Sequence, residues 1–107
     1  LILPDHIDKD ADTWFQHFSE RVNENLDRVG YRLCPGEIMA RNPQYHKTLT
    51  AWRRQLSHIA AHPTPKAARW ANVTLDFRTL YGDHNLTAAL QQHLLTSVGR
   101  SRYLLRL

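Results

Sequence analysis

Residues 34–43, CPGEIMARNP, place an acid, an arginine and an asparagine in a turn that also holds two prolines and a glycine. Guanidinium, amide and backbone N–H groups gathered in such a turn are hydrogen-bond donors that can face a bound ligand. Arg41 and Asn42 are therefore candidate substrate-binding residues. The alternative is that the prolines and the glycine only set the shape of the backbone.

A second set of polar residues lies in WANVTLDFRTLYGD, residues 70–83. Asn72 and Asp76 are spaced one helical turn apart, with Arg69 a further turn behind, so we expect the three to share one helix face. Arg78 is expected to project elsewhere. Asn72, Asp76 and Arg78 are the remaining binding candidates, and a structural salt bridge between an acid and one of the arginines is the alternative.

Other reactive residues do not form a recognisable site. His58 and His62 stand one turn apart, a spacing that suits a metal, but HIAAH lacks the glutamate of a zincin motif. We expect these two residues to be exposed or capping histidines. The chain has no glycine-rich phosphate loop, and we expect it to lack the carboxylate pair that usually holds magnesium on a nucleotide. No catalytic and no metal-binding residue is therefore expected in it.

The composition is that of an ordinary soluble globular protein, with 107 residues, 42% of them hydrophobic and 22% charged. The formal net charge of +4 is too mild and too dispersed to indicate nucleic-acid binding. A single cysteine excludes an internal disulfide. No apolar run approaches the roughly 20 residues that span a bilayer. We expect a cytoplasmic protein that binds neither nucleic acid nor a membrane.

Helical periodicity dominates the chain after a short apolar start, Leu1-Ile2-Leu3, which resembles the end of a strand whose beginning is missing. The expected fold is mainly α, a bundle of four to five helices with this short N-terminal strand remnant. A short extended piece is expected at 31–33. The helices are expected at 12–29 with Gly30 at the C-terminal end, 48–62 capped by Thr48, 65–81 capped by Thr64 with Gly82 just past the end, 83–97 ended by Gly99, and 101–107 capped by Ser101.

Apolar stripes predict which helix faces are buried. The third helix is expected to be central, because its apolar residues cover more than one face. The expected inward residues are Phe15, Phe18, Val22, Leu26 and Val29 in the first helix, Leu49, Trp52, Leu56, Ile59 and Ala60 in the second, Ala67, Ala68, Trp70, Ala71, Leu75 and Leu80 in the third, and Leu86, Ala89, Leu90, Leu94 and Val98 in the fourth.

The turn GYRLCPGEIMARNPQYHKTLTAWRRQL followed by PTPKAARWANVTLDFRTLYGDHNL resembles a family of nucleotidyltransferases related to the GlnD (protein-PII uridylyltransferase) type. In that family a catalytic domain precedes a helical substrate-binding domain marked by a C-P-G-G-x-M-A-x-N-P turn and an F-D-x-R helix that ends in G-D. The resemblance covers nearly the whole chain. Two residues depart from the pattern: Leu75 stands where phenylalanine is usual, and Glu37 where glycine is usual.

The resemblance implies a fragment of such an enzyme in a bacterial signalling protein with CBS and often cyclic-nucleotide-binding domains. Residues 1–33 would be the end of the catalytic domain and residues 34–107 the substrate-binding domain. The implied reaction transfers a nucleotidyl group from a nucleoside triphosphate to an acceptor, with Mg²⁺ held by aspartates outside this chain. Implied partners are the nucleotide, an acceptor protein, the rest of the parent chain and, as an open alternative, a second copy. The rival interpretation is a non-catalytic helical module for regulation or dimerisation.

Overall fold

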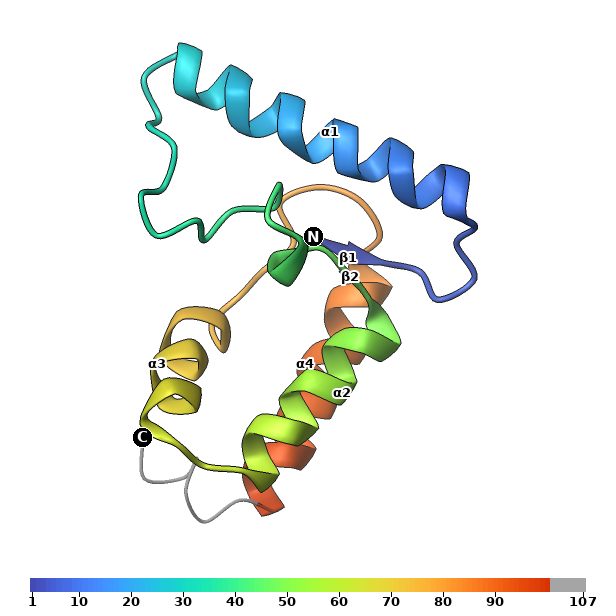
Figure 1. The fold of residues 1–107 in the computed structure, drawn as a ribbon. Coiled ribbons are helices and arrows are strands. Elements are labelled where there is room, and N and C mark those ends of the chain that lie inside the picture. Colours follow the sequence, from blue (N-terminus) through green and yellow to red (C-terminus); the bar gives the residue numbers. More distant parts are fainter. Residues whose placement is uncertain (101–107) are drawn as a thin grey trace. The chain divides into compact units, whose positions relative to one another are not determined.

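The computed structural model describes residues 1–100, apart from the side chain of Val98, and confirms a mainly helical chain with a short strand at its start. The chain forms two compact units, Leu1–Thr48 and Leu49–Leu107, which are treated separately below. The predictions for Val98 and for a helix starting at Ser101 fall outside what the structure describes. In chain order the elements are β1 (Ile2–Leu3), α1 (Lys9–Arg28), the 3-10 helix η1 (Pro43–Tyr45), β2 (Lys47–Thr48), α2 (Leu49–Ala61), α3 (Pro65–Thr74) and α4 (His84–Arg100) (Figure 1).

The first unit is built on a pair of very short parallel strands. Ile2 pairs with Lys47 and Leu3 pairs with Thr48, so β1 and β2 run in the same direction. Parallel neighbours need a long crossover connection, and α1 supplies it here. The predicted strand at the chain start is confirmed, but its partner β2 was missed because Thr48 was interpreted only as a helix cap.

Both ends of α1 are closed by side-chain or backbone caps. The carboxylate of Asp8 accepts a hydrogen bond from the backbone N–H of Ala11 at 2.8 Å, so the helix starts earlier than the predicted Asp12. At the other end Gly30 has a φ of +106°, and the N–H of Tyr31 reaches back to the carbonyl of Leu26 at 2.9 Å. This geometry is a Schellman motif, which confirms the predicted role of Gly30. Residues 31–33 adopt no regular structure, so the predicted extended piece is absent there.

The apolar stripe of α1 is buried only in its first half. Phe15 and Phe18 are half-buried and pack with Trp14, whose ring stacks on that of Phe18 at 5.3 Å. Val22, Leu26 and Val29 are 37%, 43% and 72% exposed, so the prediction that they are buried is wrong. In the second half of α1, polar side chains rather than this stripe hold the loop that follows the helix, as described below.

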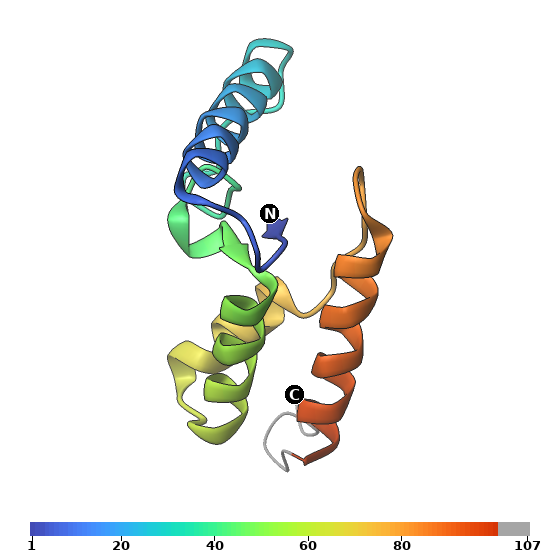
Figure 2. The same ribbon diagram turned by 90° about the vertical axis from the view of Figure 1, so that its right-hand side faces the viewer.

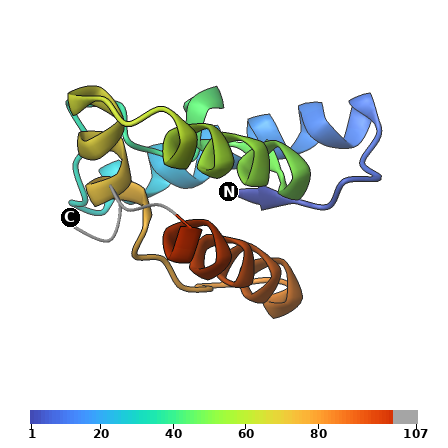
Figure 3. The same ribbon diagram turned by 90° about the horizontal axis from the view of Figure 1, so that it is seen from below.

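In the second unit α2 and α4 lie alongside each other and run in the same general direction (Figures 2 and 3). The buried side chains are Trp52, Leu56 and Ile59 of α2, Ala71 of α3 and Leu90 of α4. α3 packs on α2 mainly through the contact of Ala71 with Ile59, and the rings of Trp52 and Trp70 lie 6.1 Å apart. The apolar faces predicted for α2 and α4 are confirmed at these positions, whereas α3 is not the central helix.

α3 begins as predicted but ends at Thr74, seven residues before the predicted end at residue 81. Thr64 accepts a hydrogen bond from the N–H of Ala67 at 3.0 Å, and Pro65 is the first helical residue. The helix ends at Thr74, whose hydroxyl donates to the carbonyl of Trp70. Leu80, predicted to be inward, lies beyond the helix and is 87% exposed.

Two smaller differences concern α4 and the membrane. α4 continues through Gly99 to Arg100, so Gly99 does not end it as predicted. Among the helices that the structure describes, none combines the length and the apolar character that crossing a bilayer requires.

Candidate functional site

The turn at 34–43 is held against α1 by polar side chains of that helix. The amide oxygen of Asn23 accepts the backbone N–H of Arg41 at 3.0 Å. The side-chain amide of Gln16 donates to the backbone carbonyl of Arg41 at 2.8 Å. Both backbone polar groups of Arg41 are therefore fixed by α1, which sets the direction in which its side chain leaves the turn.

The same row of α1 also fixes the segment on either side of the turn. Asp27 accepts the backbone N–H of Leu33 at 3.1 Å, and Asp12 lies 3.1 Å from the imidazole Nε2 of His46. Asp12, Gln16, Asn23 and Asp27 are spaced four, seven and four residues apart, so they form one helical row. The apolar period of this helix does not reveal this polar row, which the sequence therefore did not predict.

Inside the turn, Asn42 is a structural residue. Its side-chain Nδ2 donates to the carbonyl of Glu37 at 2.8 Å, and its Oδ1 accepts the N–H of Gln44 at 3.1 Å, which caps η1. The N–H of Glu37 also donates to the carbonyl of Cys34 at 3.0 Å, which closes a tight turn. Both ends of the Asn42 amide are thus engaged within the turn, and a role of Asn42 in substrate binding stays a prediction.

Glu37 occupies the one backbone position in the turn that favours glycine. Its φ of +56° lies in the left-handed region, which is unfavourable for residues with a Cβ. This explains physically why glycine fits the fourth position of a C-P-G-G turn. The Glu37 carboxylate lies 3.3 Å from Nη2 of Arg41, whose side chain is 29% exposed. Arg41 therefore presents a partly exposed cation that already has one carboxylate partner.

A neighbouring cation belongs to Lys47 at the start of β2. Its ammonium donates to the carbonyl of Gln44 at 2.6 Å, and partial burial lowers the pKa of Lys47. The segment from the turn to β2 thus carries two basic residues, Arg41 and Lys47.

We expect Glu37→Gly to raise the free energy of unfolding by up to about 1 kcal/mol. Relief of the left-handed strain is worth about 1–2 kcal/mol, and the greater freedom of glycine in the unfolded chain offsets about 0.4–1 kcal/mol of it. Urea denaturation measures the difference. The matched control is Gly36→Ala, because Gly36 has no positive φ and an added Cβ would meet only ordinary contacts at 3.8–3.9 Å. A destabilised Glu37→Gly variant would show that the carboxylate matters more than the backbone strain.

A family model described as "Putative nucleotidyltransferase DUF294" matches residues 1–66 of the chain. The match includes β1, the whole of α1, the turn at 34–43 and α2. This chain belongs to that family. Comparison with curated proteins and with solved structures gives no match. The expected domain boundary between residues 33 and 34 stays a prediction. Along the sequence of this DUF294 chain, the boundary between the two compact units falls after Thr48.

The three other candidates lie in the second unit, beyond the matched residues. Asn72 is exposed on α3, whereas Asp76 and Arg78 are exposed in the loop 75–83. The prediction that Asn72 and Asp76 share a helix face is therefore wrong. Within residues 1–100 neither Asp76 nor the two arginines Arg69 and Arg78 form an ion pair, so the alternative of a structural salt bridge is not supported there either.

The loop 75–83 has a clear structural role at its end. Gly82 has a φ of +102°, and the carboxylate of Asp83 accepts the N–H of Asn85 at 2.9 Å, which caps α4. The hydroxyl of Thr79 bonds that of Thr87 at 2.6 Å, which ties the loop to α4. The G-D pair of the sequence pattern is thus a turn and a helix cap.

We expect Asp76→Asn to change the free energy of unfolding by less than about 0.5 kcal/mol, because the carboxylate is exposed and unpaired within residues 1–100. Thermal unfolding followed by circular dichroism measures this. A loss of several kcal/mol would show that Asp76 is paired after all, and Asp83→Ala is the comparison, since that change removes a helix cap.

The front of the chain contains closely spaced carboxylates, although the chain was expected to lack a metal-binding carboxylate pair. Asp8, Asp10 and Asp12 alternate along residues 8–12, a spacing seen in carboxylate pairs that bind metals. The structure places all three at the start of α1, where Asp8 is the cap and Asp12 meets His46. In the described part of the chain no three His, Cys, Asp or Glu residues come together as a potential metal site.

The two histidines at the end of α2 behave as predicted. His58 and His62 are exposed, their rings stack at 4.4 Å, and Nδ1 of His62 lies 3.1 Å from the carbonyl of His58. A histidine that bonds the last turn of its own helix satisfies a carbonyl that the helix leaves open. Neither residue belongs to the candidate site.

Proposed function

We propose that this chain is the end of a GlnD-like catalytic domain together with its helical substrate-binding domain, in a bacterial signalling protein of the CBS-associated type. The reaction joins an acceptor oxygen to the α-phosphorus of a nucleoside triphosphate, breaks the α–β phosphoanhydride bond and releases pyrophosphate. Within residues 1–100 no three His, Cys, Asp or Glu residues come together, and no step of this proposal passes through a metal held by these residues. Magnesium would be bound by aspartates of the parent protein that lie outside this chain.

The observation that carries the proposal is the way α1 fixes Arg41. The family match spans β1, α1 and the turn, and Gln16 and Asn23 hold both backbone groups of Arg41. A guanidinium on a fixed backbone loses little freedom when it binds, and it is the side chain best suited to pair with phosphate oxygens. Arg41 is therefore proposed to contact the nucleotide phosphates, and Glu37 holds the guanidinium in place when no nucleotide is bound.

The experiment for this proposal is a label-transfer assay on the complete protein. The complete protein is incubated with Mg²⁺, labelled nucleoside triphosphates and candidate acceptors, and the 107-residue chain is assayed beside it. We expect transfer by the complete protein and none by the chain alone. Transfer by the chain alone would contradict the placement of the metal-binding carboxylates outside it. No transfer by the complete protein with any nucleotide would overturn the proposed reaction.

A second candidate function is a non-catalytic interaction or dimerisation module, and one observation favours it. Trp14, Leu26, Val29 and Tyr31 are 55%, 43%, 72% and 71% exposed on and just after α1. Exposed apolar side chains gathered along one helix are typical of protein contacts. Analytical ultracentrifugation of the chain and of Val29→Asp tests this. A dimer that Val29→Asp dissociates supports the module, and a monomer at all concentrations counts against it.

A further inference from the structure

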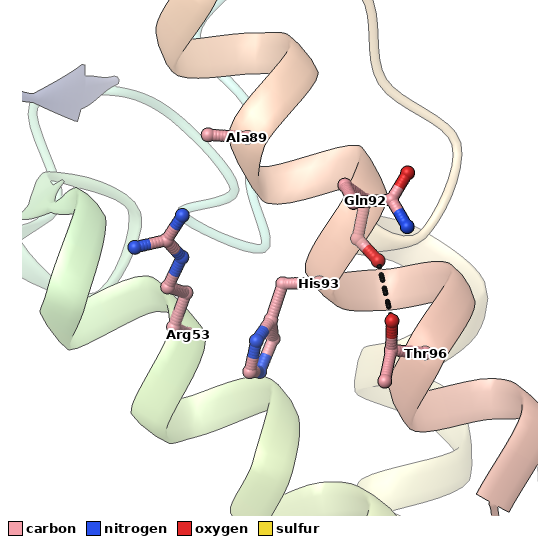
Figure 4. Close-up of a pocket in the computed structure, with 5 residues that line it drawn as sticks. All are labelled: Arg53, Ala89, Gln92, His93 and Thr96. Atoms are coloured by element: carbon pink, nitrogen blue, oxygen red, sulfur yellow. Dashed lines mark hydrogen bonds between the residues drawn. The ribbon is translucent and has the colours of Figure 1, made fainter.

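A shallow groove lies between α2 and α4, within the second unit and apart from the turn. Its volume is about 410 Å³, and it is lined by Arg53, Ala89, Gln92, His93 and Thr96. Figure 4 shows Arg53 reaching from α2 and His93 reaching from α4 into the space between the helices. The groove is thus lined by two nitrogen-rich side chains from opposite walls.

Among residues 1–100 no carboxylate neutralises the Arg53 side chain. Its guanidinium forms no hydrogen bond or ion pair with any of these residues. A guanidinium stays charged at all physiological pH values and carries five N–H donors. A half-buried cation with unused donors in a groove is suited to an anion.

The polar contacts of His93 leave one ring nitrogen for a ligand. Its Nε2 lies 2.9 Å from the hydroxyl of Ser57, one turn after Arg53 on α2. This contact fixes the ring across the groove, and Nδ1 is the nitrogen that remains. The hydroxyl of Thr96 is engaged differently, because it donates to the backbone carbonyl of Gln92 at 3.1 Å (Figure 4).

The charge of the surrounding elements favours an anion. Neither α2 nor α4 contains an Asp or a Glu. Residues 49–107 hold eight Lys and Arg against two Asp, whereas residues 1–48 hold six against eight. A groove without carboxylates in a basic unit concentrates anions. The other charged or titratable groups of the described elements in this unit are Arg54, His58 and His62 on or after α2, Lys66 and Arg69 on α3, Asp76, Arg78, Tyr81 and Asp83 in the loop 75–83, and His84 and Arg100 on α4.

We propose that this groove binds a phosphate group, with the Arg53 guanidinium and the His93 imidazole as its donors. Phosphate offers several oxygens at once, which matches donors arriving from two sides. The phosphate could belong to the chain of a nucleotide or be inorganic, and both present the same chemistry to the groove. Neither Arg53 nor His93 takes part in the turn that holds Arg41, so the inference is independent of the role proposed for Arg41.

NMR titration of the ¹⁵N-labelled 107-residue chain tests the proposal with ATP and with sodium pyrophosphate as separate probes, at constant ionic strength. We expect shifts confined to the residues around Arg53, Ser57 and His93. Tighter binding of ATP than of pyrophosphate identifies a nucleotide as the source, and equal or tighter binding of pyrophosphate identifies an inorganic source. No localised shift with either probe would overturn the proposal.

Two variants make the test specific. Arg53→Gln is expected to weaken binding at least about tenfold, the loss typical of one charge-assisted contact. The neighbouring exposed Arg54→Gln, the matched control, is expected to change it less than about twofold. Equal losses of affinity in Arg53→Gln and Arg54→Gln would show that only the general positive charge of this unit attracts the probe, and would overturn the proposed site.

The histidine is tested by substitution. His93→Gln is expected to weaken binding at least about threefold, because it removes the imidazole that reaches into the groove from α4, whereas His58→Gln is expected to leave the affinity unchanged. Equal affinities of His93→Gln and the original chain would remove His93 from the site. Circular dichroism verifies that each variant is folded, and Arg53→Lys, which keeps the charge, replaces Arg53→Gln if that variant unfolds.

Discussion

Trp52→Ala is expected to lower the free energy of unfolding of the second unit by about 3–5 kcal/mol, enough to unfold a domain of ordinary stability. The indole is only 7% exposed, and its ring lies 6.1 Å from that of Trp70. Truncation would remove this aromatic contact and leave a cavity between α2 and α3. Urea denaturation followed by far-ultraviolet circular dichroism measures the loss.

The matched control is Trp14→Ala. Trp14 is 55% exposed, so its truncation is expected to cost about 1 kcal/mol, mainly from the lost stacking on Phe18. Equal effects of the two substitutions would show that Trp52 does not belong to the core. Trp70→Phe is informative beside them, because Nε1 of Trp70 is buried without a hydrogen-bond partner among the described residues. Removing that N–H offsets part of the volume lost.

Arg41→Gln in the complete protein is expected to lower kcat/KM for nucleotidyl transfer by about 30–150-fold. The loss corresponds to about 2–3 kcal/mol, the usual range for a hydrogen-bonded contact with a charged group. Stability should change little, because the pair of Arg41 with Glu37 is partly exposed and worth about 1 kcal/mol or less. Steady-state kinetics with labelled nucleotide measures the effect.

The control for this prediction is Arg21→Gln. Arg21 lies exposed on α1 in the same unit and takes no part in holding the turn. Arg21→Gln removes the same charge as Arg41→Gln. A comparable loss of transfer in Arg21→Gln would therefore point to long-range electrostatics rather than to a contact. Arg41→Lys is expected to recover only part of the activity, because an ammonium cannot pair with two phosphate oxygens in a plane.

The sequence was sufficient where a local signal has a single physical meaning. Pro65 after Thr64 marks the start of α3, and Gly30 marks the end of α1, because each residue suits a backbone position that few others tolerate. The strand at the chain start and the mainly helical fold followed in the same way. The apolar period also located Trp52, Leu56 and Leu90 in the core.

The sequence failed where tertiary contacts decided between two local options. The segment after Thr74 continues a plausible helical period, but two hydrogen bonds with α4 hold it in a loop. The hydroxyl of Thr79 donates to that of Thr87, and the side-chain amide of Gln91 donates to the carbonyl of Phe77. Asp76 and Arg78 consequently lie in a loop and not in the helix that was predicted for them. The polar row of α1 was not predicted for a similar reason. Gln16 and Asn23 bond the backbone of Arg41 only when the turn packs against α1.

The central claim is that Arg41 exchanges its carboxylate partner for the phosphates of a nucleotide. The most direct measurement is the Kd of the complete protein for a non-hydrolysable nucleoside triphosphate, compared between Arg41→Gln and Glu37→Gln. The account predicts opposite effects: Arg41→Gln weakens binding at least about tenfold, whereas Glu37→Gln tightens it about two- to fivefold because it removes the competing carboxylate 3.3 Å from the guanidinium. Unchanged affinity in both variants, or a loss in both, would contradict it.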